Sequence, residues 1–238
     1  MIIVTGSSQN HFKSLKQLVK SYTDIYSEEG SLSVRMIVYN LGIDATDWEN
    51  FIRDTSNIKS IEYKIFQYEK YPEYFNINIE AGQYAWKPAI VYETHLIANG
   101  DNIVWMDAGN KITAPLDILS NYLKQFHIHT HVTNGPVKEW THPKTIEFMH
   151  ADEFLECRNR NGACIAFNTS ISWINDLIKD WYNMAITEEC IAPKGSDRSN
   201  HRQDQAVFTI LYYYYKKNHN FNDDIFFPHP YICHCDCD

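Results

Sequence analysis

The sequence predicts a single α/β domain, with a mixed, mainly parallel sheet flanked by helices. Strand-like and helical segments alternate through the first half of the chain. The run Asn102–Met106 is mostly apolar, which is typical of a central strand covered on both faces. The 238 residues, 44% of them hydrophobic, suffice for one large domain with a full core, with or without an appendage.

The first half is expected to contain four strands with helices between them. Apolar residues recur with helical spacing after the first strand, and Asp44 or Thr46 could cap the second helix. Pro88 in the first turn and Asn99-Gly100 at the end delimit the third helix. The expected strands are Ile2–Thr5, Ser33–Tyr39, Ser60–Phe66 and Asn102–Met106; the expected helices are His11–Ser27, Asp47–Asn57 and Lys87–Asn99.

The remaining segments are less regular. Tyr68–Gly82 is aromatic and shows no clear period, whereas Leu116–Phe126 is amphipathic and is expected to be helical. The other expected elements are a strand at Ala163–Asn168, helices at Ser170–Ile186 and Gln203–Lys216, and a polar loop at Ile191–Asn200.

Composition excludes several classes of function. A net charge of −9 argues against nonspecific binding to nucleic acid or to an anionic membrane. No stretch approaches the roughly 18 consecutive apolar residues of a membrane span. The N-terminal MIIVTGSS lacks a basic flank, so it favours a first strand over a signal peptide. A cytoplasmic location is therefore expected.

The six cysteines fall into two groups. Cys157, Cys164 and Cys190 are scattered and are expected to be free thiols. The other three alternate with His234 and two aspartates in the terminal CHCDCD. Zinc sites usually place cysteines two to four residues apart within a framework, so we expect a frayed tail rather than a metal site.

The end of the strand Asn102–Met106 is the first candidate site. Asp107 stands where open α/β sheets bind ligands, at the carboxyl end of a strand. Ala108 and Gly109 follow, and their small side chains would let a ligand approach the backbone. The alternative is that Asp107 simply opens a turn.

Two further segments could contact a nucleotide. The loop containing Thr5, Gly6 and Ser7 follows the first strand and could bind a nucleotide through backbone N–H groups, although it is neither GxGxxG nor a P-loop. Lys87 begins a helix, where a cation is unfavourable unless an anion such as a diphosphate is bound there. The alternatives are an ordinary loop and a solvated lysine beside a packed Trp86.

A polar cluster precedes the last long helix. His201, Arg202, Asp204 and Gln205 bring a base, a cation, a carboxylate and an amide together within five residues. The preceding loop, which contains Lys194, is flexible enough to close over a site. Helix capping by Asp204 would equally explain the pattern.

Taken together, these motifs resemble a known family. YAWKP at 84–88, WMDAG at 105–109, ECIAPKGS at 189–196 and HRQDQ at 201–205 are similar to a glycosyltransferase-like family of the GT-A nucleotide-diphospho-sugar transferase type, several of whose members are domains of unknown function. The turn YNLGI at 39–43 also fits, and the match spans most of residues 1–215. The resemblance implies a Rossmann-like GT-A domain over 1–225, with a nucleotide-binding half at about 1–112, an acceptor-side half at about 113–225, and a tail at 226–238.

The resemblance also implies roles for single residues. Asp107 takes the place of the metal- and diphosphate-binding DXD motif, whose second acidic residue is missing here. Lys87 would face the donor phosphates, His201 would contact metal or phosphate, and Asp204 would contact the sugar or act as the base. The implied nucleotide-sugar-binding residues are Thr5, Gly6, Ser7, Tyr84, Trp86, Lys87, Asp107, Ala108, Gly109, Lys194, Arg202 and Gln205.

The implied cofactor is Mn²⁺ or Mg²⁺, held by Asp107 and His201 together with the diphosphate and water. A metal-free enzyme could instead neutralise the leaving diphosphate with Lys87, Lys194 or Arg202. An inverting enzyme also needs a base, for which Asp204 is the first candidate and Asp152 or Glu153 the second. A retaining enzyme could do without one.

Three functions follow from these patterns. The first is transfer of a sugar, from a UDP-sugar by preference, to a glycan or another hydroxyl acceptor. The second is a catalytically inactive relative that binds sugars or a partner protein, which the missing acidic residue favours. The third is another nucleotide-dependent α/β transferase, such as a nucleotidyltransferase, against which the single strand-end aspartate argues.

Overall fold

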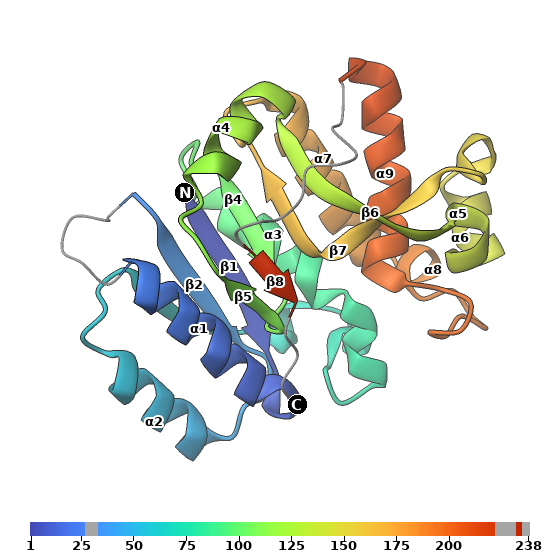
Figure 1. Ribbon diagram of the computed structural model, residues 1–238. Coiled ribbons are helices and arrows are strands. Elements are labelled where there is room, and N and C mark those ends of the chain that lie inside the picture. The colour runs from blue at the N-terminus through green and yellow to red at the C-terminus, as the bar shows by residue number, and fades with distance from the viewer. Residues whose placement is uncertain (27–32, 222–231, 235–238) are drawn as a thin grey trace.

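The computed structural model describes residues 1–26, 33–221 and 232–234. Its main sheet has six strands in the order β3-β2-β1-β4-β7-β6 (Figure 1). The strands are β1 (Ile2–Ser7), β2 (Arg35–Asn40), β3 (Ile61–Ile65), β4 (Ile103–Met106), β6 (Ile128–Pro136) and β7 (Arg158–Phe167). The first four pair in parallel, whereas β7 is antiparallel to both β4 and β6. The predicted mixed, mainly parallel sheet is therefore confirmed.

Helices cover both faces of this sheet (Figure 1). Helices α1 and α2 pack on one face, and α3, α7 and α9 pack on the other. The helices are α1 (Phe12–Tyr26), α2 (Ala45–Thr55), α3 (Trp86–Leu96), α4 (Asp117–Phe126), α5 (Val137–Trp140), α6 (Pro143–Phe148), α7 (Ser172–Ala185), α8 (Glu188–Ile191) and α9 (Gln203–His219). Short 3-10 turns lie at Gln9–His11, Tyr68–Lys70, Glu73–Phe75 and Asp152–Phe154, and a turn of positive φ lies at Glu80–Tyr84.

The alternation of side chains along β1 and β4 explains the two cores. Ile2 and Val4 point to the α3 side, whereas Ile3 points to the α1 side, and all three are fully buried. On β4, Trp105 packs on the α3 side and Val104 on the α1 side. Because both faces of β4 are covered, its residues are apolar throughout, and the prediction of a central strand is confirmed.

The first half matches the predicted elements within a few residues. Strand β1 is longer than expected, because Gly6 pairs with Tyr39 and Ser7 with Asn40, so the loop expected from Gly6 starts at Ser8. Asp44 stands at the N-cap of α2, but its side chain makes no capping hydrogen bond. Helix α3 ends at Leu96 rather than at Asn99.

The second half contains strands that the sequence pattern did not predict. Strand β6 lies at the edge of the sheet and is largely polar, and β7 begins at Arg158 rather than at Ala163. An edge strand with one solvated face buries few side chains, so its apolar signal is weak. The division between the two halves at about residue 112 and the start of a tail after residue 225 remain predictions.

The expectation of a frayed tail is wrong for residues 232–234. Strand β8 (Ile232–His234) pairs antiparallel with β5 (Asn110–Ile112), which begins three residues after Asp107. Ile232 is buried in the core on the α1 side, which accounts for the pairing. The remaining residues of the expected tail lie outside the described part of the chain.

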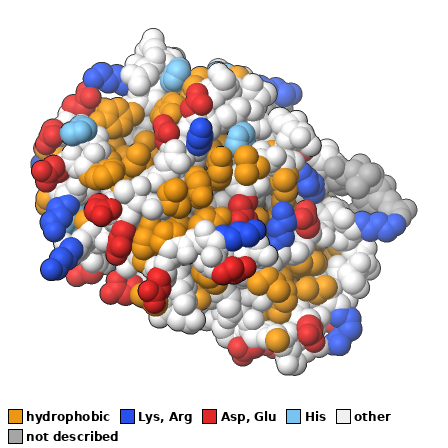
Figure 2. Space-filling view, turned by 180° about the vertical axis from the view of Figure 1, so that it is seen from behind, with side chains coloured by type: hydrophobic (Ala, Val, Ile, Leu, Met, Phe, Trp, Pro, Cys, Tyr) orange, Lys and Arg blue, Asp and Glu red, His pale blue; other side chains and the backbone are white. Residues whose placement is uncertain are grey.

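The surface agrees with the charge argument. On the face turned away in Figure 1, Lys and Arg side chains are scattered among Asp and Glu (Figure 2). None of the helices built from residues 1–26, 33–221 and 232–234 is long and apolar enough to cross a membrane. Cys157, Cys164 and Cys190 are free thiols, as expected.

Candidate functional site

A cavity of about 600 Å³ opens at the carboxyl ends of β1, β2 and β4. Its lining comes from five regions: the end of β1 with the loop after it, the turn after β2, the segment that leads into α3, the turn after β4, and the loop before α9. Eight of the predicted site residues line it: Gly6, Ser7, Tyr84, Trp86, Lys87, Asp107, Ala108 and Gly109. The fold thus brings together three sequence segments that were singled out separately.

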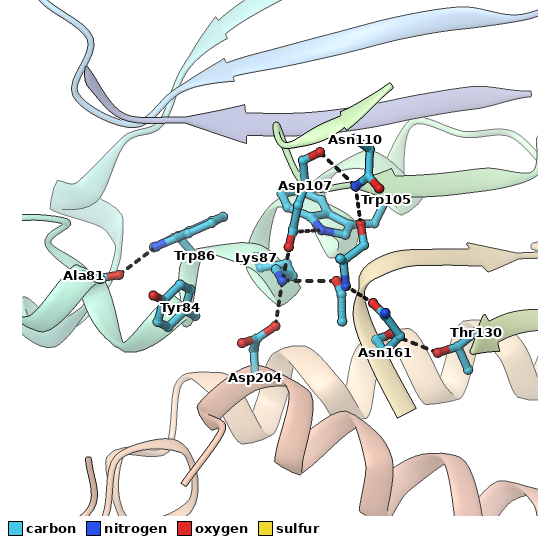
Figure 3. A network of polar contacts seen from close by, with 12 residues as sticks. Ala81, Tyr84, Trp86, Lys87, Trp105, Asp107, Asn110, Thr130, Asn161 and Asp204 are labelled. Carbon is cyan, nitrogen blue, oxygen red and sulfur yellow. Dashed lines mark hydrogen bonds and ion pairs between the residues drawn. The ribbon is translucent and has the colours of Figure 1, made fainter. Parts of the chain in front are cut away.

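Asp107 is held in a defined orientation at the end of β4. Its N–H donates to the carbonyl of Ala163 at 2.8 Å, and the indole Nε1–H of Trp105 donates to its Oδ1 at 2.7 Å (Figure 3). The Nζ of Lys87 lies 3.0 Å from the same Oδ1. Among the described residues, no hydrogen bond or ion pair reaches Oδ2. The side chain is 36% exposed, so this second oxygen is available to a ligand in the cavity.

Lys87 is a buried counterion. It lies in the first turn of α3, a position that Pro88 also favours because proline suits the start of a helix. Only 4% of Lys87 is exposed. Its Nζ lies 3.0 Å from Asp107 Oδ1, 3.0 Å from Asp204 Oδ2 and 3.1 Å from the carbonyl oxygen of Gly162 (Figure 3). Burial alone would lower the pKa of Lys87, but the two carboxylates outweigh it and raise that pKa above its ordinary value.

Three oxygen atoms of the protein, two of them from carboxylates, lie within 3.1 Å of the ammonium nitrogen of Lys87. Lys87 lines the cavity, and its charge is shared between the carboxylates of Asp107 and Asp204. That Lys87 faces the donor phosphates stays a prediction.

Asp204 lies on the far side of Lys87 from Asp107 (Figure 3). It stands in the first turn of α9, is 4% exposed and does not line the cavity. Burial raises the pKa of Asp204, an effect that the charge of Lys87 partly offsets. The structure thus gives Asp204 the surroundings of a buried ion-pair partner, and its predicted contact with the sugar stays a prediction.

His201 is also withdrawn from the cavity. It is fully buried, its Nδ1 accepts the backbone N–H of His142 at 3.2 Å, and its Nε2 lies 3.0 Å from the carbonyl oxygen of Ile191. Because Nδ1 accepts, the neutral ring donates through Nε2–H. Burial lowers the pKa of His201 to about 4, which is consistent with a neutral ring. With both ring nitrogens engaged, His201 does not fit the expected role of metal ligand.

The other expected contacts also lie outside the cavity lining. Thr5 is buried within β1, and Lys194 is exposed on its loop. The guanidinium of Arg202 lies 4.3 Å from the ring centroid of Trp140, and Gln205 Nε2 lies 3.5 Å from Thr133 Oγ1. Asp152 and Glu153, the alternative candidates for the catalytic base, are exposed on the 3-10 turn Asp152–Phe154. Glu153 forms an ion pair there with Lys217.

Arg198 lines the cavity, although the sequence pattern did not single it out. It is exposed, it donates through Nη1 to the hydroxyl of Tyr84, and its guanidinium lies 5.0 Å from the centroid of that ring. The available signal was its place in the polar loop Ile191–Asn200. Lys194 and Arg202 were predicted as contacts instead, because they belong to the motifs that carry the resemblance.

An unusual backbone turn places Tyr84 and Trp86 at the cavity. Residues Glu80–Tyr84 have consecutive φ values of 46, 56, 62, 49 and 54°, which is a left-handed helical turn. A left-handed conformation costs about 1–2 kcal/mol per non-glycine residue. The Trp86 Nε1–H donates to the carbonyl of Ala81 at 3.0 Å, and Gln83 donates to the carboxylate of Glu80, so local contacts stabilise the turn.

The described residues offer a divalent cation only a partial ligand set. No group of three or more His, Cys, Asp or Glu side chains in the described part of the chain is arranged to hold a metal. Asp107 offers one free carboxylate oxygen. Mg²⁺ is commonly held by one or two carboxylates plus substrate phosphates and water. The site therefore fits a cation that arrives with a diphosphate, with Asp107 as its protein ligand.

Comparison with known proteins gives the fold a name. Residues 1–92 match a family described only as a protein of unknown function, DUF1647. No curated protein sequence matches the chain. The fold is similar to that of the galactosyltransferase LgtC in complex with donor and acceptor sugar analogues, with a TM-score of 0.57, 15% identity, and 89% of this chain and 70% of that chain covered.

Two further solved structures share the fold. Mouse xyloside xylosyltransferase 1 aligns with a TM-score of 0.53 and 11% identity, over 100% of this chain and 98% of its own. Core-mannan synthase A from Aspergillus fumigatus, in a Mn/GDP form, aligns with a TM-score of 0.51 and 10% identity, over 88% of this chain and 68% of its own. All three are glycosyltransferases, and at these identities the likeness concerns architecture. The chain has the GT-A glycosyltransferase fold, as the resemblance implied.

Proposed function

We propose that this protein is a glycosyltransferase that transfers a sugar from a nucleotide-diphospho-sugar to a hydroxyl group of a glycan or another acceptor. The observation that carries the proposal is Asp107, whose Oδ2 is free at the strand-end cavity of a GT-A fold. Ligands bind open α/β sheets at this edge. The cavity volume of about 600 Å³ lies within the range of small-molecule sites. A UDP-sugar is the donor that we favour, in a cytoplasmic setting.

The chemistry gives Asp107 and its neighbours defined tasks. Glycosyl transfer breaks the bond between the sugar and a diphosphate, so positive charge near the leaving group lowers the barrier. Mn²⁺ or Mg²⁺ bound at Asp107 would supply that charge. Lys87 and Trp105 hold the other oxygen of Asp107, so that its orientation is set before a ligand binds. Preorganisation of this kind avoids a reorganisation cost during the reaction.

A second candidate is a sugar- or partner-binding protein without catalysis. Gly109 stands where the DXD motif would have its second carboxylate, and Asp204 is closed off by Lys87. Both features remove groups that an active enzyme could use. A nucleotidyltransferase has less support, because a two-metal site would need more cavity-facing carboxylates than Asp107 among the described lining residues.

The test is a thermal-shift screen of UDP-, GDP-, CMP- and dTDP-sugars, with Mn²⁺ or with EDTA, on the wild type, Asp107→Ala and Asp54→Ala. Asp54 is an exposed aspartate on α2 and serves as the matched control. A donor that binds the folded state raises the melting temperature. We expect one nucleotide class to raise it in the wild type and in Asp54→Ala, and not in Asp107→Ala.

The same samples are then assayed for slow hydrolysis of the donor that binds. Hydrolysis lost in Asp107→Ala supports the transferase, whereas binding without any turnover supports the inactive relative. No shift with any donor contradicts the proposal. Release of pyrophosphate from a nucleoside triphosphate would favour the nucleotidyltransferase.

A further inference from the structure

Arg198 and Tyr84 form a bridge at the cavity, between the loop before α9 and the left-handed turn before α3. The guanidinium donates to the Tyr84 hydroxyl and lies 5.0 Å from the ring centroid. Both residues line the same cavity as Lys87 and Asp107. Figure 3 shows Tyr84 beside Trp86, on one side of Lys87.

The two cationic side chains at the cavity differ in how many of their N–H groups already have a partner in the protein. Lys87 and Arg198 are the one lysine and the one arginine among the described residues that line the cavity. The ammonium nitrogen of Lys87 already lies within 3.1 Å of three protein oxygen atoms, two of them from carboxylates. Arg198 has a planar fork of several N–H donors, and its one hydrogen-bond acceptor within the described residues is the uncharged hydroxyl of Tyr84. Arg198 therefore has donors to spare for an anion.

The loop holds the backbone around Arg198 while its side chain stays exposed. The carboxylate of Asp197 accepts from the N–H of Ser199 at 2.7 Å, and Asn200 Nδ2 donates to the carbonyl of Gly195 at 3.0 Å. These bonds lie on either side of Arg198, whose side chain lines the cavity. The neighbouring cations face elsewhere, because Arg202 lies over Trp140 and Lys194 is not part of the lining.

We propose that Arg198 binds the diphosphate of a bound nucleotide, exchanging the Tyr84 hydroxyl for phosphate oxygens. The inference rests on the proposed function and names the protein group that stabilises the leaving diphosphate. A phosphate carries negative charge and can accept two parallel N–H bonds from a guanidinium, whereas the phenol is an uncharged acceptor of one, so a diphosphate displaces the phenol. Tyr84 holds the cation at the cavity until then.

The experiment measures binding by calorimetry with UDP, GDP and CDP, each beside its nucleoside, on five proteins. They are the wild type, Arg198→Gln, Tyr84→Phe, Lys194→Gln and, as the matched control, Arg53→Gln on the exposed face of α2. We expect Arg198→Gln to weaken the best diphosphate by about tenfold or more and its nucleoside by less than about twofold. Arg53→Gln should match the wild type, and Tyr84→Phe should bind the diphosphate at least as tightly.

The outcomes separate the inference from the function on which it rests. A diphosphate that binds the wild type and Arg198→Gln equally well overturns the role of Arg198 and leaves the proposed function standing. The same conclusion follows if Arg198→Gln weakens the binding of nucleoside and diphosphate equally. It also follows if Lys194→Gln, and not Arg198→Gln, weakens the binding of the diphosphate. If the wild type binds no nucleoside diphosphate, the proposed function fails and the role of Arg198 fails with it. An unchanged melting temperature of Arg198→Gln checks that this variant is folded.

Discussion

The ammonium nitrogen of Lys87 lies 3.0 Å from Oδ1 of Asp107, the same oxygen to which the indole of Trp105 donates. Two donors on one oxygen leave the other oxygen of the carboxylate free at the cavity (Figure 3). Lys87 is also 3.0 Å from Asp204, so two carboxylates compete for one buried cation. This arrangement determines how Asp107 meets a ligand, and it makes the stability of the fold depend on Lys87.

Replacing Lys87 with methionine should unfold much of the population at moderate denaturant. Asp204 would remain buried without its counterion, which typically costs about 3–5 kcal/mol. The double variant Lys87→Met/Asp204→Leu should recover most of that loss, because it removes the buried charge of Asp204, and Asp107, which also loses Lys87, is partly exposed to solvent. Urea unfolding of both variants measures the difference. Lys217→Met, which breaks the exposed pair with Glu153, should cost less than about 1 kcal/mol. Equal losses at the two lysines would contradict this account.

Stability should fall as the pH is lowered from about 6.5 to about 4, partly because of His201. Burial lowers the pKa of His201 from 6.5 to about 4. In this window the unfolded chain binds a proton that the folded protein does not bind, so stability rises with pH and is lost on acidification. The contribution is at most about 3 kcal/mol.

Urea unfolding at several pH values should show a smaller slope in His201→Gln than in the wild type. His150→Asn, a change at an exposed histidine, serves as the control and should keep the wild-type slope. If His201→Gln keeps it as well, the buried neutral ring does not explain the acid sensitivity.

Gly82→Ala should be more damaging than Gly100→Ala, although both glycines have positive φ. A Cβ on Gly82 would lie 2.3 Å from the carbonyl oxygen of Phe75 and 2.9 Å from Cδ1 of Trp86, whereas nothing lies within 4 Å of one on Gly100. Backbone strain alone, about 1–2 kcal/mol, is expected at Gly100. Overpacking should add about 1–3 kcal/mol at Gly82. Chemical denaturation compares the two, and equal losses would mean that the left-handed turn adapts easily.

Trp105→Phe should make the orientation of the Asp107 carboxylate less fixed without changing the charge of the site. The variant keeps an aromatic ring in the core and removes the Nε1–H that donates to Oδ1. A hydrogen bond to a charged group contributes about 1.5–3 kcal/mol, so the melting temperature should fall. We also expect weaker donor binding, because Asp107 loses one of two groups that orient it. Trp48→Phe, a buried tryptophan on α2, controls for lost aromatic volume and should leave donor binding unchanged.

The elements of the first half could be predicted because their patterns are local. Helix α1 repeats its apolar residues every turn, and β4 is apolar because both of its faces are buried. Strand β6 escaped prediction because it is an edge strand whose residues are largely polar. The pairing of β8 with β5 depends on two segments that are far apart in sequence, so no local pattern reveals it.

In the candidate site too, some residues could be identified from a local pattern and the roles of others could not. Asp107 could be identified because a carboxylate after an apolar strand must emerge at the edge of the sheet. The roles expected for His201 and Asp204 could not be tested by pattern, because the direction of a side chain at a helix start depends on what packs against that helix. Packing turns His201 toward the backbone of Ile191 and His142, and Asp204 toward Lys87.

Taken alone, the sequence determined the class of fold, the order of its first strands and helices, and the edge of the sheet at which a ligand would bind. These properties follow from the spacing of apolar residues and from the strand-to-helix connections, which are local. The tertiary structure decided which charges are free at the cavity. Lys87 and Asp204 neutralise each other while Arg198 keeps unused donors, because charge pairing depends on distances between side chains from different elements.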